Sequence, residues 1–252
     1  MTVARTLASF GVRSLLVERH PATTRHPKMD ITNGRSMELF RRWNLDAPIF
    51  DRAPFHFEDQ FKPGDAVYYA GDITRSGSNA QFQLVDERIV GRKPASLDFA
   101  QAAALPLTTI TAWELLFHRM PYTPDGGGHG KSLLVIAGAG GVGSIAIQLA
   151  RRAGFTVIAT ASRQDTIDWC KALGADHVIN HREPLAPQLK ALGFDNVDAA
   201  LNLADTDHYW TALGELLAPL GHVGLIVEPR GELRIGDPYK AKSIGIHWEM
   251  MF

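Results

Sequence analysis

The sequence is poor in cysteine, since Cys170 is the only one among 252 residues. The printed chain therefore cannot form an internal disulfide, and its cysteine usage fits a reducing cytosol. A structural zinc site made of four cysteines is excluded as well, because one thiolate cannot supply the ligands. No arrangement of His, Asp and Ser indicates covalent catalysis, and we assign no catalytic residue from the sequence.

The sequence also lacks an excess of charge of either sign. Its 26 basic and 27 acidic residues give a formal net charge of −1, which provides neither a basic footprint for nucleic acid nor a polybasic membrane patch. No apolar run reaches the length of a membrane span. The first twenty residues carry Arg5 and Arg13 and no small-residue cleavage site, so they do not read as a signal peptide. We expect a cytoplasmic protein without nucleic-acid or membrane partners.

The amino-acid pattern changes twice along the chain. A strand at 14–18 and a helix-like, arginine-rich run at 36–43 lie in the first part. Strand-and-turn material follows at about 60–97, and a helix is expected through 99–106. These changes predict three domains, at 1–52, 53–105 and 106–252.

A regular alternation of strands and helices begins after Lys131. Strands are predicted at 132–137, 155–161, 176–180, 197–203 and 222–227. Helices are predicted near 142–152, 165–173, 185–192 and 207–218. The helices are followed by Gly154, Gly174, Gly193 and Gly221, the expected left-handed stops. Short strands alternating with helices predict an α/β fold with a doubly wound, Rossmann-type parallel sheet.

The run GAGGVG at 138–143 fits the pattern G-x-G-x-x-G between an apolar strand and an amphipathic helix. Glycines at its first and third positions allow a tight turn and a close approach to a pyrophosphate, and the last lets the helix pack on the strand. The helix amino terminus adds unpaired N–H groups and a positive dipole. The predicted cofactor contacts here are Gly138, Gly140, Gly141, Val142 and Gly143. The alternative is a glycine-rich turn that holds no ligand.

A competing nucleotide motif, DGGGHGKS, lies just upstream at 125–132. A P-loop would need glycine in place of Asp125 and a helix after Ser132. A strand is expected there instead, so we do not interpret this run as a P-loop.

The tip of the second strand indicates which dinucleotide is bound. An NAD site places a carboxylate there to bind the adenosine ribose, whereas this strand ends in Ser162 and Arg163. Asp165 is expected in the first turn of the following helix, where its charge suits the helix dipole. A hydroxyl and a guanidinium favour a 2′-phosphate, so NADPH is predicted over NADH. The alternative for Arg163 is a solvated surface side chain.

Residues from about 62 to 252 resemble the medium-chain dehydrogenase/reductase superfamily, in its branch of quinone oxidoreductases and zinc-type alcohol dehydrogenase-like proteins. The likeness is carried by KPGDAVYYAG, AAALPLTTITAWELL, AGAGGVGSIAIQLAR, TVIATASR, KALGADHVIN and SIGIHWEMMF. The resemblance implies a GroES-like barrel and a Rossmann domain with the nicotinamide between them. It also implies hydride transfer from NADPH to a small-molecule substrate, a quinone or an α,β-unsaturated carbonyl, and a homodimer as a possible assembly.

The same resemblance implies that Thr111 lies near the nicotinamide and that Asn180 and Asn202 lie along the cofactor, although each could equally be a capping or strand-end residue. Relatives with a catalytic zinc use cysteine and histidine ligands, which this chain cannot match with one cysteine. His177 and His181 are four apart on a predicted strand and loop, where that spacing does not bring them together. A zinc-independent reaction is therefore expected, in which hydrogen-bond donors polarise the substrate.

Residues 1 to about 50 resemble a fragment of the FAD-dependent aromatic-ring monooxygenases, in which a glutamate, here Glu18, would hold the ribose of FAD. The glycine fingerprint of that family precedes the helix with which this chain begins, so FAD binding is not expected. The first half of the barrel is replaced and the chain stops at Phe252, before the barrel would be completed. We expect a fusion of two fragments, by natural rearrangement or by gene assembly.

Three functions follow in order of preference. The first is a zinc-independent, NADPH-dependent reductase. The second is a non-catalytic NADPH-binding remnant of such a reductase, and the third is a fragment of an FAD-dependent monooxygenase.

Overall fold

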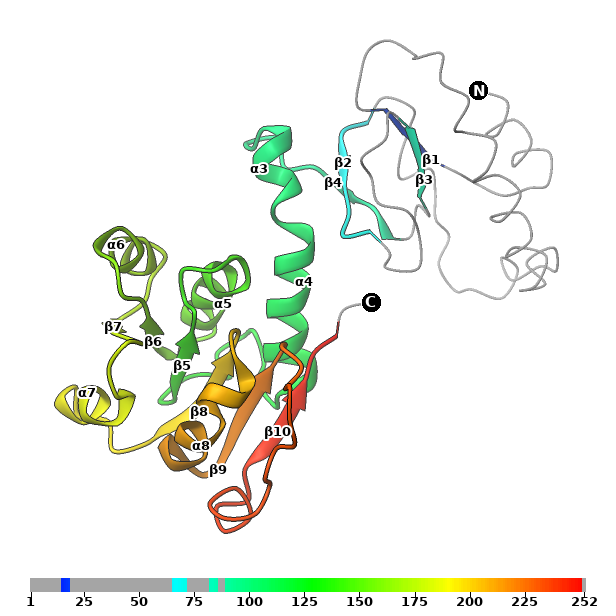
Figure 1. Ribbon diagram of the computed structural model, residues 1–252. Coiled ribbons are helices and arrows are strands. Elements are labelled where there is room, and N and C mark those ends of the chain that lie inside the picture. Colours follow the sequence, from blue (N-terminus) through cyan, green and yellow to red (C-terminus); the bar gives the residue numbers. More distant parts are fainter. Residues whose placement is uncertain (1–14, 19–64, 72–81, 86–88, 251–252) are drawn as a thin grey trace, which may run out of the picture. The chain divides into compact units, whose positions relative to one another are not determined.

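A computed structural model describes residues 15–18, 65–71, 82–85 and 89–250 (Figure 1). The chain divides into two compact units, Met1–Ala103 and Ala104–Phe252. The predicted helix-like run at 36–43 lies outside the described residues, and the predicted domain boundaries stay predictions. Within the described part of the chain, no helix is both long and apolar enough to cross a membrane.

The first unit contains two short antiparallel pairs of strands. Strand β1 (Leu15–Glu18) pairs with β3 (Phe82–Val85), so the predicted strand at 14–18 is confirmed. Strand β2 (Val67–Tyr68) pairs with β4 (Gly91–Arg92). The position of the Glu18 side chain lies outside what the structure describes.

A small apolar cluster and a capped helix complete the described part of this unit. Its buried valines are Val67, Val85 and Val90. Helix α3 (Phe99–Ala103) follows Asp98, whose Oδ1 accepts the N–H of Gln101 at 2.7 Å, while Gln101 Oε1 accepts the N–H of Asp98 at 3.0 Å. This reciprocal capping box satisfies two amides that the helix start would leave unpaired.

The second unit is built on a parallel sheet. Its strands are β5 (Ser132–Ile136), β6 (Thr156–Thr160), β7 (His177–Ile179), β8 (Val197–Asn202), β9 (Leu217–Leu225) and β10 (Gly245–Trp248). They lie in the order β10-β9-β8-β5-β6-β7, and every neighbouring pair is parallel. This is the 3-2-1-4-5-6 order of the Rossmann fold, whose strand order reverses between its first and fourth strands, here β5 and β8. The predicted doubly wound α/β fold is confirmed for this unit.

Helices cover both faces of this sheet (Figure 1). They are α4 (Pro106–Glu114), the π-helix η4 (Leu115–Arg119), α5 (Gly141–Arg152), α6 (Gln164–Ala172), α7 (Leu185–Ala191) and α8 (Thr206–Leu216). Leu133 and Val135 of β5 join a core with η4, α5 and α6, whereas Leu134 and Ile136 join a core with α7 and α8. All residues of β5 are buried, because both faces of a central parallel strand are covered.

The sequence prediction merges two helices and misses one strand. The helix expected through 99–106 ends at Ala103, and a second helix, α4, begins at Pro106, because proline suits the first helical turn but cannot continue a helix. Strand β10 is not predicted at all. Its four residues, GIHW, include no buried residue, and a run this short is a weak strand signal even though Ile246 and Trp248 alternate with less apolar residues.

Three of the four predicted glycine stops are confirmed. Gly154, Gly174 and Gly193 have φ angles of 92°, 106° and 89°, a left-handed conformation that glycine adopts without a steric penalty. Each follows a helix and ends it. The turn therefore explains why these positions carry no side chain.

The prediction for Gly221 is wrong, because this residue lies inside β9, which begins at Leu217 rather than at 222. The end of α8 is capped differently. The Nζ of Lys242 donates to the carbonyls of Gly214, Glu215 and Leu217 at 3.1, 2.6 and 2.8 Å. An ammonium in this place satisfies the last carbonyls and opposes the negative end of the helix dipole, so no glycine is needed.

Candidate dinucleotide site

The turn between β5 and α5 is fixed by the neighbouring strand. The N–H of Ala137 donates to Thr160 Oγ1 at 3.0 Å, and the N–H of Gly138 donates to the Thr160 carbonyl at 3.2 Å. The N–H of Gly140 then turns back to the carbonyl of Ala137 at 2.9 Å. The left-handed residue of this tight turn is Ala137, with φ 59°, and not one of the glycines, which corrects the expectation that glycine enables the turn.

The glycines are needed for space instead. A Cβ at position 143 would lie 2.4 Å from the carbonyl oxygen of Ala137 and 2.7 Å from that of Gly138. A Cβ at position 138 would lie 2.8 Å from the Cβ of Ala159. Contacts this short are forbidden between carbon and backbone atoms, so the helix can meet the strand this closely only without these side chains. The predicted packing role of Gly143 is confirmed.

The start of α5 leaves three main-chain amides unpaired. Its N-cap residue, Gly140, has no side chain to cap them, and the first helical hydrogen bond runs from the N–H of Ser144 to the carbonyl of Gly140 at 2.8 Å. The N–H groups of residues 141–143 thus have no acceptor among the described residues, as the geometry of a helix start requires. With the dipole of a twelve-residue helix behind them, they fit a phosphate or pyrophosphate group.

Helix α4 closes one side of this turn. A Cβ at position 141 would lie 2.9 Å from Cγ2 of Thr108, so Thr108 is the α4 residue that reaches the glycine turn, and the sequence analysis missed it. The predicted Thr111 lies one turn further along, is 4% exposed, and donates its hydroxyl to the carbonyl of Leu107 at 2.8 Å. A cofactor contact of Thr111 stays a prediction.

The segment after β6 carries the predicted selectivity residues. Ser162 is half-buried, and Arg163 is the N-cap of α6 with a side chain that is 66% exposed. Asp165 lies in the first turn of α6, as predicted, and its Oδ1 is 3.3 Å from Arg163 Nε. A hydroxyl and a guanidinium therefore stand at the strand tip where an NAD site places a carboxylate.

Both predicted asparagines make local capping contacts. Asn180 follows β7, its Oδ1 accepts the N–H of Arg182 at 3.0 Å, and its Nδ2 donates to Glu183 at 3.3 Å. Asn202 ends β8, is fully buried, and bridges the N–H of Ala204 and the carbonyl of Asp205 at 3.3 and 3.4 Å. The capping role is thus present at both positions, and cofactor contact stays a prediction.

His177 and His181, which the sequence does not predict as metal ligands, lie in different surroundings. Among the residues that the structure describes, no group of three or more His, Cys, Asp or Glu side chains could hold a metal ion. His177 lies edge-on against Phe194, with ring centroids 5.8 Å apart. His181 has a buried Nδ1 without a hydrogen-bond partner among the described residues.

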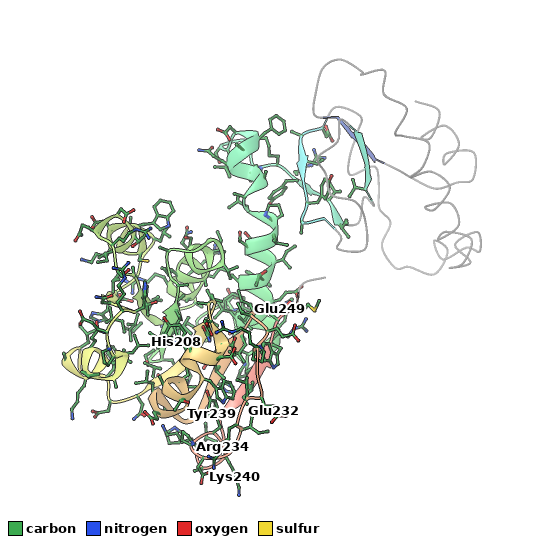
Figure 2. All side chains as sticks on the ribbon, viewed as in Figure 1. His208, Glu232, Arg234, Tyr239, Lys240 and Glu249 are labelled. Carbon is green, nitrogen blue, oxygen red and sulfur yellow. The ribbon has the colours of Figure 1, made fainter. Side chains whose placement is uncertain are left out.

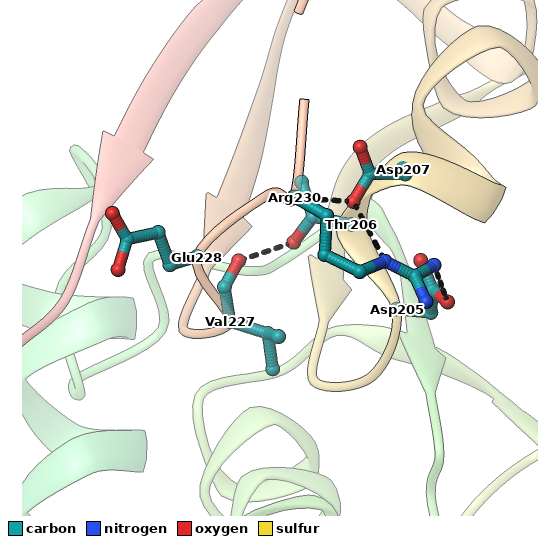
Figure 3. Close-up of a pocket in the computed structure, with 6 residues that line it drawn as sticks. All are labelled: Asp205, Thr206, Asp207, Val227, Glu228 and Arg230. Carbon is teal, nitrogen blue, oxygen red and sulfur yellow. Dashed lines mark hydrogen bonds and ion pairs between the residues drawn. The ribbon is translucent and has the colours of Figure 1, made fainter. Parts of the chain in front are cut away.

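A polar hollow lies at the carboxyl ends of β8 and β9 (Figure 3). It holds about 230 Å³ and is lined by Asp205, Thr206, Asp207, Val227, Glu228 and Arg230. The charges in it are largely paired with each other: Arg230 Nη2 is 2.6 Å from Asp205 Oδ2, and the N–H of Arg230 donates to Asp207 at 2.9 Å. This N–H is the main reason why the pKa of Asp207 is lowered. These contacts hold the 227–231 loop against the start of α8.

A buried carboxylate lies where β10 ends (Figure 2). The Glu249 side chain is fully buried and its Oε2 accepts Arg119 Nε at 2.7 Å, while Oε1 has no partner among the described residues. Glu114 Oε2 is 3.6 Å from Nη2 of the same arginine. Five residues make about 1.4 turns of an α-helix, so Glu114 and Arg119 would point apart without the π-turn between them. The i→i+5 bond from the N–H of Met120 to Leu115 brings them to one side.

Comparisons with known proteins match two parts of the chain to different models. Residues 141–242 match the zinc-binding dehydrogenase family model, and residues 1–98 match the FAD binding domain model. A zinc-type alcohol dehydrogenase-like protein of Staphylococcus aureus (strain MSSA476) is 46% identical over 194 residues, which are 76% of this chain and 57% of that protein. The chain thus spans little more than half the length of this curated relative.

Solved structures agree with this match. An alcohol dehydrogenase superfamily protein from Novosphingobium aromaticivorans superimposes with a TM-score of 0.66 at 30% identity, covering 76% of this chain and 56% of that chain. A quinone oxidoreductase from Thermus thermophilus, which was also solved in complex with NADPH, gives a TM-score of 0.55 at 26% identity, covering 68% of this chain and 53% of that chain.

Proposed function

We propose that this chain binds NADPH and reduces a quinone or an α,β-unsaturated carbonyl without zinc. It matches a zinc-type alcohol dehydrogenase-like protein over 76% of its length and a quinone oxidoreductase over 68%, both from the medium-chain dehydrogenase/reductase superfamily. The observation that carries the proposal is the set of unpaired amides at 141–143, placed directly after the first strand of a 3-2-1-4-5-6 sheet.

The proposed pose follows from this position. The pyrophosphate lies on the amides of 141–143, at the point where the strand order reverses between β5 and β8. The adenosine half extends past β6, where Ser162 and Arg163 stand at the strand tip. The nicotinamide half then extends in the other direction, towards β8 and β9 and the hollow that contains Thr206.

The choice of NADPH rests on the chemistry of that strand tip. A guanidinium binds a phosphate through charge-assisted hydrogen bonds, and Arg163 is exposed enough to meet one. The relative that was solved with NADPH supports the same choice. No acidic residue stands at the end of β6 to bind the two ribose hydroxyls of NADH.

When bound, NADPH supplies a hydride to an electron-poor carbon of the substrate. The residues of this chain bind and orient the cofactor, and positioning supplies most of the rate enhancement in such a reaction. The predicted partial GroES-like barrel at 53–105 and the flavoprotein-like fragment at 1–52 belong to the same proposal.

The direct test is oxidation of NADPH by the purified full chain. Loss of nicotinamide absorbance on adding a quinone or an enone, above a protein-free blank, supports the proposal. Gly143→Val serves as the matched variant, because its side chain would fill the space beside the carbonyl of Ala137, and it should lose both binding and oxidation. Binding of NADPH with oxidation at the blank rate would instead indicate a non-catalytic remnant.

A second candidate function is favoured by the match of residues 1–98 to the FAD binding domain model. On this reading the first unit holds a flavin. A purified protein that is yellow, with flavin fluorescence released on denaturation, would support it. A colourless protein that binds no added FAD would reject it.

A further inference from the structure

The segments that follow β6 and β7 bring basic side chains to one edge of the sheet. The two strands are neighbours and parallel, with Thr160 opposite Ile179, and the N–H of Ala161 donates to the carbonyl of Ile179 at 3.0 Å. Chain segments that leave adjacent parallel strands begin side by side. Arg163 and His181 therefore follow the same edge from two different strands.

His181 combines an unpartnered ring nitrogen with the influence of two positive charges. Its Nδ1 is buried and has no hydrogen-bond partner among the described residues. Burial lowers the pKa of this imidazole, and the charges of Arg182 and Arg163 lower it further. The ring is therefore neutral at neutral pH in the free protein, with a buried nitrogen that the fold does not use.

The same two segments also carry two carboxylates, and each already has a partner. Asp165 pairs with Arg163 through Nε at 3.3 Å. Glu183 accepts from Asn180 Nδ2 at 3.3 Å. The positive charges of Arg163 and Arg182 thus act on His181 at the sheet edge where the proposed pose puts the adenosine ribose, and a doubly charged phosphate there would reverse the electrostatic balance at His181.

We infer that His181 couples the recognition of the 2′-phosphate to a proton: NADPH binds with uptake of a proton by His181, whereas NADH binds without it. The inference rests on the proposed function, since it needs the dinucleotide in that pose. Below neutral pH the chain then becomes more selective for NADPH. Arg182 is the second guanidinium of the cluster and contributes to the affinity for NADPH at every pH.

The direction of the pH dependence distinguishes protonation of His181 from protonation of the ligand's own phosphate. Because the free imidazole is neutral and the bound one is charged, affinity for NADPH rises as pH falls through the pKa of the complex and levels off below that of the free protein. The phosphate itself also titrates, with a pKa of about 6. Its protonation weakens binding as pH falls, which is the opposite trend.

The test is calorimetric titration of the full chain with NADPH and with NADH, at several pH values from acidic to alkaline and in buffers of different protonation enthalpy. We expect an uptake that approaches one proton per NADPH near neutral pH and none with NADH. His181→Gln should abolish the uptake and reverse the pH trend, because only the phosphate then titrates. His208→Gln, an exposed histidine on α8, should behave as the wild type.

Circular dichroism checks that His181→Gln is folded, and its affinity for NADH provides a second control. An unchanged proton count and pH profile in a folded His181→Gln protein overturns this inference alone. Failure of the wild-type chain to bind NADPH at any pH overturns the proposed function as well. Arg182→Ala should lose at least tenfold in NADPH affinity and retain its affinity for NADH. This result would support a contribution of Arg182 to binding of the 2′-phosphate.

Discussion

At position 143 a single hydrogen occupies the place where any other amino acid would carry a carbon. The glycine pattern in the sequence predicts this close approach, and the 2.4 Å that would separate a Cβ from the Ala137 carbonyl oxygen gives its cause. The residue that adopts the left-handed turn is less predictable. Ala137 takes it because the hydroxyl and carbonyl of Thr160 hold the turn, and no local pattern indicates a contact across two strands.

Arg163 is the residue whose substitution separates the two dinucleotides. Removing a guanidinium that binds phosphate costs about 1.5–3 kcal/mol, so Arg163→Ala should weaken NADPH binding by about 10–100-fold and change NADH binding by less than about twofold. Fluorescence titration with both cofactors measures this. Arg152→Ala, an exposed arginine at the end of α5, is the control. Equal losses for NADPH and NADH would contradict the assignment.

At the scale of single elements, sequence patterns predict the middle of a helix or strand better than its ends. The apolar run of β5 and the amphipathic start of α5 are both found where expected. The end of α8 is not, because its cap is a lysine that lies 25 residues or more from the carbonyls it binds. A long-range cap of this kind leaves no signal near the helix.

The lysine cap is testable through stability. Lys242→Met keeps the aliphatic stem but removes the ammonium from the carbonyls of Gly214, Glu215 and Leu217, and it should lower the free energy of unfolding by about 1–2 kcal/mol. Urea denaturation followed by circular dichroism measures the change. Lys240→Met is the control, because Lys240 is exposed. Equal stability of the two variants would argue against the cap.

The buried Glu249, which contacts Arg119 of the π-helix η4, makes the free energy of unfolding depend on pH. Burial raises the pKa of Glu249, so the folded chain holds this proton at a pH where the unfolded chain has released it. The stabilisation is then present below the unfolded pKa of about 4.3 and is lost as pH rises through the folded pKa. Glu249→Gln cannot ionise and should show a flatter profile over this range.

The free energy of unfolding in urea, measured at a series of pH values from about 4 upwards, tests the expectation for Glu249. The series starts close to the pKa of glutamate in the unfolded chain. Glu215→Gln, an exposed glutamate on α8, should follow the wild-type profile. A Glu249→Gln profile that parallels the wild type would show that this carboxyl group ionises normally.

At the scale of the whole molecule, the order of the strands decides where a dinucleotide can bind. The alternation of strands and helices predicts a parallel sheet, and the comparisons and the 3-2-1-4-5-6 order confirm it. The glycine turn after the first strand then falls beside the reversal of strand order. The hollow at Asp205 and Arg230 could not be predicted from the sequence, because its residues come together only when β8 and β9 are adjacent.

An outer strand of this sheet also predicts assembly. Strand β10 has a neighbour on one side only among the described strands, and its Trp248 is 44% exposed. Such an edge pairs readily with a second copy, and we expect a homodimer in analytical ultracentrifugation. Trp248→Arg should shift the mass towards the monomer, while Ile235→Arg, at another exposed apolar residue, should not. A wild-type monomer at all concentrations would contradict this expectation.

We propose that the amides of residues 141–143 bind a dinucleotide, and amide resonances report on this binding directly. In the ¹⁵N-glycine-labelled full chain, NADPH should shift the signals of Gly141 and Gly143 most strongly, with smaller changes at Gly154 and Gly193, which end α5 and α7. If NADPH binds by calorimetry while the signals of Gly141 and Gly143 stay in place, or if it does not bind, the account is wrong.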